Sequence, residues 1–235
     1  MRGSGPAAGP SRMATMPRLT DLSQTGPTQT DRSDWFASGP GRQLLESEAV
    51  AVQLALDERP GQPWLWLAPI LLAAPTPDRG LHLRVTATGW SGPIRCALPF
   101  PLANESVATV LIQHVPGIGA TAALLTECAR VLVPGGRLWL FALNPLAPYR
   151  WRWQGTGLSA AEPMLWRRRL RKAGLTPEPI SQGVGPRWRI ESSPELQHGP
   201  GLRAAYLLRA EKRRLPLTPV RQRAPMRIGG GVPAA

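Results

Sequence analysis

The feature that most constrains the fold of this chain is a set of short, strongly apolar segments. Three of them are rich in Leu, Val, Ile and Trp: residues 64–68 (WLWLA), 107–113 (VATVLIQ) and 137–143 (RLWLFAL). Such runs are typical of strands buried on both faces of a sheet. Segments with apolar residues at helical spacing lie between them. This alternation predicts an α/β fold with a mostly parallel sheet.

The remaining elements follow from periodicity and turn residues. We expect helices at residues 44–56, 120–132 and 162–173, and weaker strands at 81–86, 93–97, 187–191 and 202–210, the last two as an antiparallel pair. Pro134, Gly135 and Gly136 are expected to end the second helix and turn the chain. Ligands of parallel sheets bind at the carboxyl ends of the strands. The loops that follow the strands are therefore the places to search for a site.

Composition limits the domain organisation and the classes of site. Residues 1–33 and 215–235 carry few large apolar side chains, so we expect both to be disordered around one folded domain at 34–214. The two cysteines argue against a disulfide scaffold and a cysteine-built zinc site, and the three histidines form no metal-ligand spacing. No apolar run reaches the ~20 residues of a membrane span, and no secretory pattern is present. We expect a cytoplasmic protein with no metal and no membrane partner.

The charge of the chain is concentrated in its C-terminal part. The net charge is +13, of which residues 150–235 carry +12. The stretch from Arg150 to Lys172 combines several arginines with three tryptophans, a combination used to bind single-stranded nucleic acid. Arginine outnumbers lysine 26 to 2, however, which also fits genomic codon bias. A solvated helix face and tryptophans packed on the sheet are the competing interpretations.

Residues 98–144 carry a recognisable succession of motifs. An LPF turn comes first, then the strand and loop SVATVLIQHV, the helix LLTECARVL, and a Leu-x-Pro-Gly-Gly turn into the next strand. In this order the stretch resembles the C-terminal half of a class I S-adenosylmethionine-dependent methyltransferase, specifically the type 11 methyltransferase domain. Trp35, Gly41, Leu45 and Glu48 resemble a leading helix of a bacterial subgroup, so the resemblance covers roughly residues 35–213. It implies a Rossmann-like sheet with helices on both faces, and S-adenosylmethionine (SAM) as cofactor.

The resemblance also implies where the cofactor would bind. The corresponding positions are Ala68 and Pro69 after the first strand, Cys96, Ala97 and Leu98 at the LPF turn, and Gln113 at the end of the fourth strand. Three of the usual contacts are missing. Residues 67–72 (LAPILL) replace an acidic, glycine-rich loop, the second strand ends without Asp or Glu, and no Asp precedes the LPF turn. These departures indicate a decayed cofactor site; the alternative is binding through other contacts.

Two further positions are candidates on the acceptor side of the site. His114 follows the fourth strand, where relatives place residues near the transferred methyl group, and it could act as a general base. Its other interpretation is a hydrogen-bonded loop residue. Asn144 and Pro145 could line the substrate mouth or simply form the turn that ends the fifth strand.

Two functions remain open at this stage. The first is a SAM-dependent methyltransferase with an unknown acceptor. The second is a catalytically silent protein of the same fold that binds a partner such as nucleic acid through its basic C-terminal half.

Overall fold

The protein was analysed as a computed structural model, which describes residues 29–72, 79–115, 121–187 and 197–213. The predicted disordered tail lies outside these residues, as does the predicted N-terminal one up to residue 28. The first helix begins at Gln29, five residues before the predicted start of the domain. The described helices are α1 Gln29–Ala37, α2 Gly39–Ser47, α3 Ala49–Asp57, α4 Thr121–Val131 and α5 Pro163–Lys172, with a 3-10 turn at Pro148–Arg152.

The described strands form one mixed sheet. They are β1 Trp64–Ala68, β2 Gly80–Thr86, β3 Gly89–Ser91, β4 Arg95–Cys96, β5 Val107–Gln113, β6 Leu132–Leu143, β7 Leu175–Pro177, β8 Gln182–Val184, β9 Gln197–His198 and β10 Ala205–Lys212. Their order is β4-β3-β2-β1-β5-β6-β10-β8-β9, with β7 also paired to β10. The four central strands, from β2 to β6, run parallel, and every outer pair is antiparallel.

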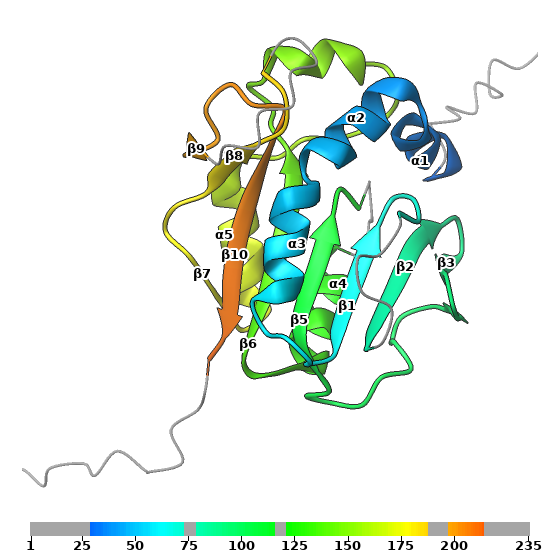
Figure 1. The fold of residues 1–235 in the computed structure, drawn as a ribbon, viewed down its shortest axis with the longest axis vertical. Coiled ribbons are helices and arrows are strands. Elements are labelled where there is room, and N and C mark those ends of the chain that lie inside the picture. The colour runs from blue at the N-terminus through cyan, green and yellow to red at the C-terminus, as the bar shows by residue number, and fades with distance from the viewer. Residues whose placement is uncertain (1–28, 73–78, 116–120, 188–196, 214–235) are drawn as a thin grey trace, which may run out of the picture.

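Helices cover both faces of the sheet, so the central strands are buried on both sides (Figure 1). In β1, Trp66 packs into a core with α1, α2 and α3, whereas its neighbour Leu67 packs into a second core with α4 and α5. This alternation explains why β1 and β5 read as continuous apolar runs. The predicted α/β fold, with a parallel centre and helices on both faces, is confirmed.

Several boundaries differ from the prediction. The predicted helix at 44–56 is two helices, α2 and α3, which meet at Glu48. The Pro134-Gly135-Gly136 segment is not a turn before the strand but an irregular part of β6, where the pairing with β5 shifts between Val107 and Thr109. Strand β3 was not predicted. The strand predicted at 187–191 lies outside the described residues apart from Arg187, and β8 at Gln182–Val184 pairs with β10 instead.

Candidate functional site

Three segments meet at the carboxyl end of β5. Gln113 ends the strand, His114 follows it, and Glu48 lies above both at the junction of α2 and α3. Glu48 is fully buried; its Oε1 lies 2.7 Å from His114 Nε2, and its Oε2 accepts a 2.8 Å hydrogen bond from Gln113 Nε2. Gln113 Oε1 accepts in turn from Trp66 Nε1 at 3.1 Å. The result is a buried polar chain that ends on a carboxylate–imidazole pair.

The direction of every hydrogen bond in this chain is determined by its two ends. The indole of Trp66 can only donate, so the Gln113 oxygen must face it and the Gln113 NH2 must face Glu48. A carboxylate only accepts, so His114 Nε2 carries a proton toward Glu48. The other ring nitrogen, Nδ1, is buried and has no hydrogen-bond partner among the described residues. The geometry therefore assigns the neutral His114 ring the tautomer with its proton on Nε2.

Local backbone features place Glu48 over the strand end. The Ser47 hydroxyl donates to the carbonyl of Leu44 at 2.6 Å, a back-bond of the kind that bends helices. Gly41 allows α2 to approach the end of α1, because a Cβ there would lie 2.2 Å from the Trp35 carbonyl oxygen. His114 itself has a positive φ of 43°, a conformation uncommon for a side chain of this size. Such backbone strain clusters at functional sites.

A small cavity of about 40 Å³ opens beside His114. Its walls are mainly apolar and come from α1, α4, the ends of β5 and β6, and residues 158–166. The ring of Phe36 stacks on His114 with centroids 5.4 Å apart. Trp166 also lines the cavity, and its Nε1 is buried with no hydrogen-bond partner in the described part of the chain. His114 and Trp166 thus line a cavity whose other walls are apolar apart from Thr121 and Ser159.

Comparison with known proteins identifies the fold of the chain. No model of a known protein family matches the chain, and no curated protein matches its sequence. A SAM-dependent methyltransferase from Thermotoga maritima, described as a possible histamine N-methyltransferase, has a similar structure, with a TM-score of 0.54 at 16% identity over 79% of this chain and 99% of that one. The chain has the class I methyltransferase fold. A Haloferax volcanii structure of the Trm112 methyltransferase activator with a methyltransferase is also similar (TM-score 0.50, 14% identity, 78% and 98% covered).

Within this methyltransferase fold, the positions that the resemblance assigns to the cofactor lie on different strands of the sheet. Ala68 is the last residue of β1 and fully buried, and Pro69 after it is also buried. Cys96 lies in β4, which β3 and β2 separate from β1. Gln113 lies beside β1, but its side chain is occupied by Trp66 and Glu48. Residues 68–72 contain no glycine and no carboxylate.

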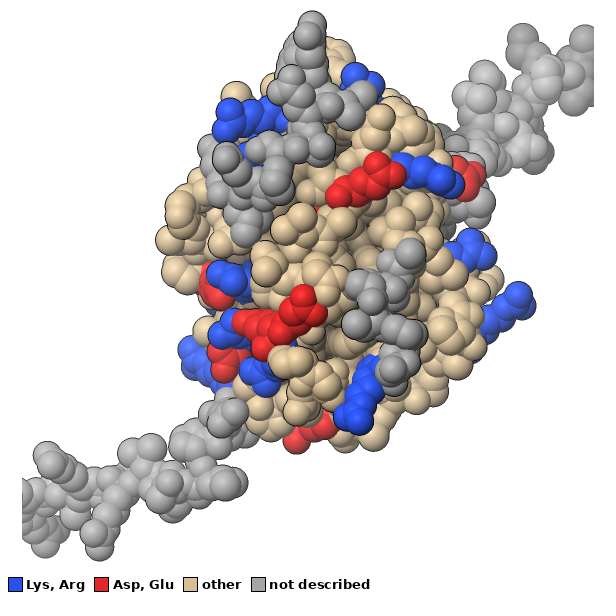
Figure 2. All heavy atoms as spheres, in the orientation of Figure 1, with Lys and Arg blue, Asp and Glu red and all other residues tan. Residues whose placement is uncertain are grey.

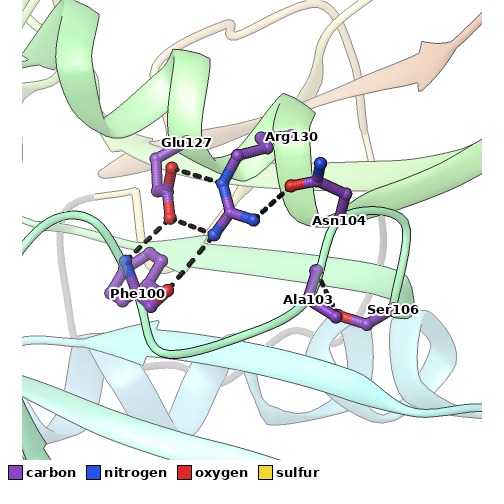
Figure 3. Close-up of polar contacts among 6 residues, drawn as sticks. All are labelled: Phe100, Ala103, Asn104, Ser106, Glu127 and Arg130. Atoms are coloured by element: carbon purple, nitrogen blue, oxygen red, sulfur yellow. Dashed lines mark hydrogen bonds and ion pairs between the residues drawn. The ribbon is translucent and has the colours of Figure 1, made fainter.

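The LPF turn is held by a separate polar network (Figure 3). Glu127 of α4 is buried, accepts from the Phe100 N–H at 2.7 Å, and binds Arg130 through both oxygens. Arg130 also donates to Asn104 and to the Phe100 carbonyl. The Arg130 hydrogen bond holds the pKa of Glu127 below its ordinary value. This network fixes the segment that follows Cys96, Ala97 and Leu98.

Asn144 is occupied by contacts within the protein. Its side-chain NH2 donates to the carbonyls of Gly201 and Arg203 at 3.0 and 2.9 Å, and its Oδ1 accepts from Leu146 N–H at 3.1 Å. These are the contacts of a residue that fixes a turn. Pro145, next to it, is half-buried and does not line the cavity beside His114.

The basic stretch is divided between the 3-10 turn and α5. Trp151 is 69% exposed, with the Arg150 guanidinium 5.9 Å from its ring centroid, but Trp153 is buried in the core with α1 and Trp166 is half-buried. Arg167 is buried and donates to the Glu178 carbonyl. On the face shown in Figure 2, Lys and Arg side chains lie around the periphery and are not gathered in one patch.

Membrane spans and metal sites were the other features that the sequence argued against. None of the described helices is both long and apolar enough to cross a membrane. No group of three or more His, Cys, Asp or Glu side chains in the same residues could hold a metal ion. His82 is buried and stacks on Trp66 with centroids 4.1 Å apart, and burial lowers its pKa to about 4, so it is neutral at neutral pH.

Sequence reasoning identified His114 but not its partner. Glu48 is 66 residues away and belongs to a helix that the periodicity predicts to be unbroken. The sequence offered two signals: Glu48 is one of two glutamates among the apolar residues of that helix, and it belongs to the resemblance to a leading helix. Neither signal names His114 as its partner.

Proposed function

We propose that the protein is a SAM-dependent methyltransferase in which His114 is the general base. The observation that carries this proposal is the Glu48–His114 pair, buried at the end of β5 beside a cavity. Burying an ionisable pair is costly, and such pairs are found disproportionately at functional sites. The methyltransferase fold supports the reaction class.

In this proposal, SAM supplies an electrophilic methyl group when bound. The residues of the chain act on the acceptor. The acceptor places its X–H group beside His114, and Nδ1 takes the proton. Glu48 keeps the proton on Nε2 and stabilises the positive charge that the ring acquires, while Gln113 and Trp66 hold the carboxylate in place. The apolar walls of the cavity keep water away from Nδ1.

The cofactor side of the site requires contacts other than the usual ones. Residues 68–72 lack the glycines and the carboxylate, and Pro69 has no N–H to donate. The proposal therefore assigns no cofactor contact to Ala68, Pro69, Cys96, Ala97 or Leu98, and it rests on the acid–base pair and on the fold.

Calorimetric titration of the full chain with SAM and S-adenosylhomocysteine tests this proposal. We expect binding in the micromolar range, with a saturable heat and one site per chain. No heat up to millimolar ligand would overturn it. If binding is found, turnover should fall at least 100-fold in His114→Asn and remain unchanged in His198→Asn, which alters an exposed histidine.

A second candidate function is a catalytically silent methyltransferase-fold protein that binds a partner such as nucleic acid through the stretch from Arg150 to Lys172. The observation that favours it is an exposed Trp151 beside Arg150, with further exposed cations on α5. Retention on single-stranded DNA should then fall steeply between 50 and 200 mM salt if about six phosphates are contacted. Absence of retention at low salt would rule this candidate out.

A further inference from the structure

Two arginines lie in register at the edge of the sheet where β2, β3 and β4 pair. Arg84 of β2 is opposite Ser91 of β3, and Ser91 is opposite Arg95 of β4. Side chains that are directly opposite across antiparallel strands point to the same face of a sheet. Both arginines are therefore on one face, with only a serine between them. On the other side of Arg84, its parallel partner is Ala68 at the end of β1.

No acidic side chain of the described residues pairs with either arginine. Both arginines are exposed, and within the described residues neither side chain forms a hydrogen bond or an ion pair. They line an open cavity of about 450 Å³ together with Thr86, Thr88 and Ser91. None of the lining residues is acidic. The cavity therefore presents two positive charges with no acidic side chain in its lining.

The hairpin that forms the cavity depends on a close backbone approach. Gly89 begins β3, and a Cβ at this position would lie 2.5 Å from the Cys96 carbonyl oxygen. The missing side chain lets β4 fold back against β3, which brings Arg95 into register with Ser91 and Arg84.

We propose that this cavity binds the phosphate group of a small molecule. Guanidinium groups match the geometry of phosphate oxygens and give charge-assisted hydrogen bonds, and the three hydroxyl groups supply further donors. A concave site of this size is within the range of small-ligand pockets, which favours a small molecule over a nucleic-acid strand. The proposal is independent of methyl transfer and of His114.

The test uses inorganic pyrophosphate as the probe, titrated calorimetrically into the full chain in a buffer free of phosphate and sulfate. The double variant Arg84→Gln/Arg95→Gln removes the two cavity charges. Its matched control is Arg168→Gln/Arg171→Gln, which removes two exposed charges from α5 and leaves the cavity intact. We expect the first variant to weaken binding at least tenfold and the control to change it less than twofold.

Three results would overturn the proposal. The first is no pyrophosphate binding by the wild-type chain at 10 mM. The second is equal weakening by the two double variants, which would assign the binding to overall charge. The third is binding of a single-stranded oligonucleotide, but not of pyrophosphate, that depends on Arg84 and Arg95. As a check on folding, both double variants should keep the wild-type urea midpoint, because all four side chains are largely exposed.

Discussion

At the scale of single residues, the site depends on Glu48 and His114. The position of His114 could be predicted because it directly follows an apolar strand, where ligands of parallel sheets bind. The role of Glu48 could not, because the two residues are 66 positions apart and the pairing arises from tertiary packing. The same holds for Trp66 and Gln113, which read as ordinary strand residues and prove to be links in the buried polar chain.

Two substitutions of Glu48 should separate the contributions of its hydrogen bonds and of its charge to the free energy of unfolding. Glu48→Ala leaves Gln113 Nε2 and His114 Nε2 without a partner and should cost about 3 kcal/mol of unfolding free energy. Glu48→Gln should cost less, about 1–2 kcal/mol, because its oxygen can still accept from Gln113 while its NH2 faces His114. Urea unfolding measures both. The control is Glu46→Ala, which alters an exposed residue of α2 and should leave the unfolding free energy within about 0.5 kcal/mol of wild type. A loss in Glu46→Ala as large as in Glu48→Ala would contradict the account.

At the scale of elements, the buried strands were predictable and the breaks were not. The apolar runs of β1 and β5 leave no other placement than the centre of a sheet. The break between α2 and α3 occurs without Gly or Pro; α2 is instead held by Tyr149, which donates to the Pro40 carbonyl at 3.0 Å. The short strands β3 and β4 carry too few residues for a periodicity to show. Contacts between distant segments therefore decide these features.

The network between α4 and the LPF turn (Figure 3) should give an acid-sensitive contribution to stability. Because Arg130 lowers the pKa of Glu127 in the folded state, the contribution is present above the carboxyl's unfolded pKa and is lost as the pH falls through the folded one. Glu127→Gln should therefore cost about 1–2 kcal/mol at pH 7 and progressively less in the acidic range below 4.5. Urea unfolding of wild type and variant at pH 7 and again below pH 4.5 measures this difference. A cost that does not change with pH would contradict the assignment.

At the scale of the whole molecule, one sheet carries two apolar cores on opposite faces. Neighbouring residues of the same strands supply both cores, so neither can unfold alone. Parallel sheets need both faces covered, and this requirement made the overall architecture predictable from the sequence. The identity of the covering helices and of the outer antiparallel strands depended on long-range packing.

Thiol labelling should show whether the core covered by α4 opens only when the whole protein unfolds. Cys128 is fully buried in α4 and burial raises the pKa of its thiol, whereas Cys96 is half-buried in β4. We expect alkylation of Cys96 in native buffer and of Cys128 only through the urea transition that tryptophan fluorescence reports. Labelling of Cys128 in native buffer at the rate of a free thiol would show that the face covered by α4 opens independently.

The central claim is that Glu48 and His114 form one buried acid–base unit with its free nitrogen at Nδ1. The most direct test is long-range ¹⁵N–¹H correlation NMR of the three histidine rings, with the His114 signals assigned through His114→Asn. We predict that the neutral His114 ring carries its proton on Nε2, toward Glu48, and none on Nδ1. In Glu48→Gln the proton should move to Nδ1. A wild-type His114 ring with its proton on Nδ1 and none on Nε2 would contradict the account.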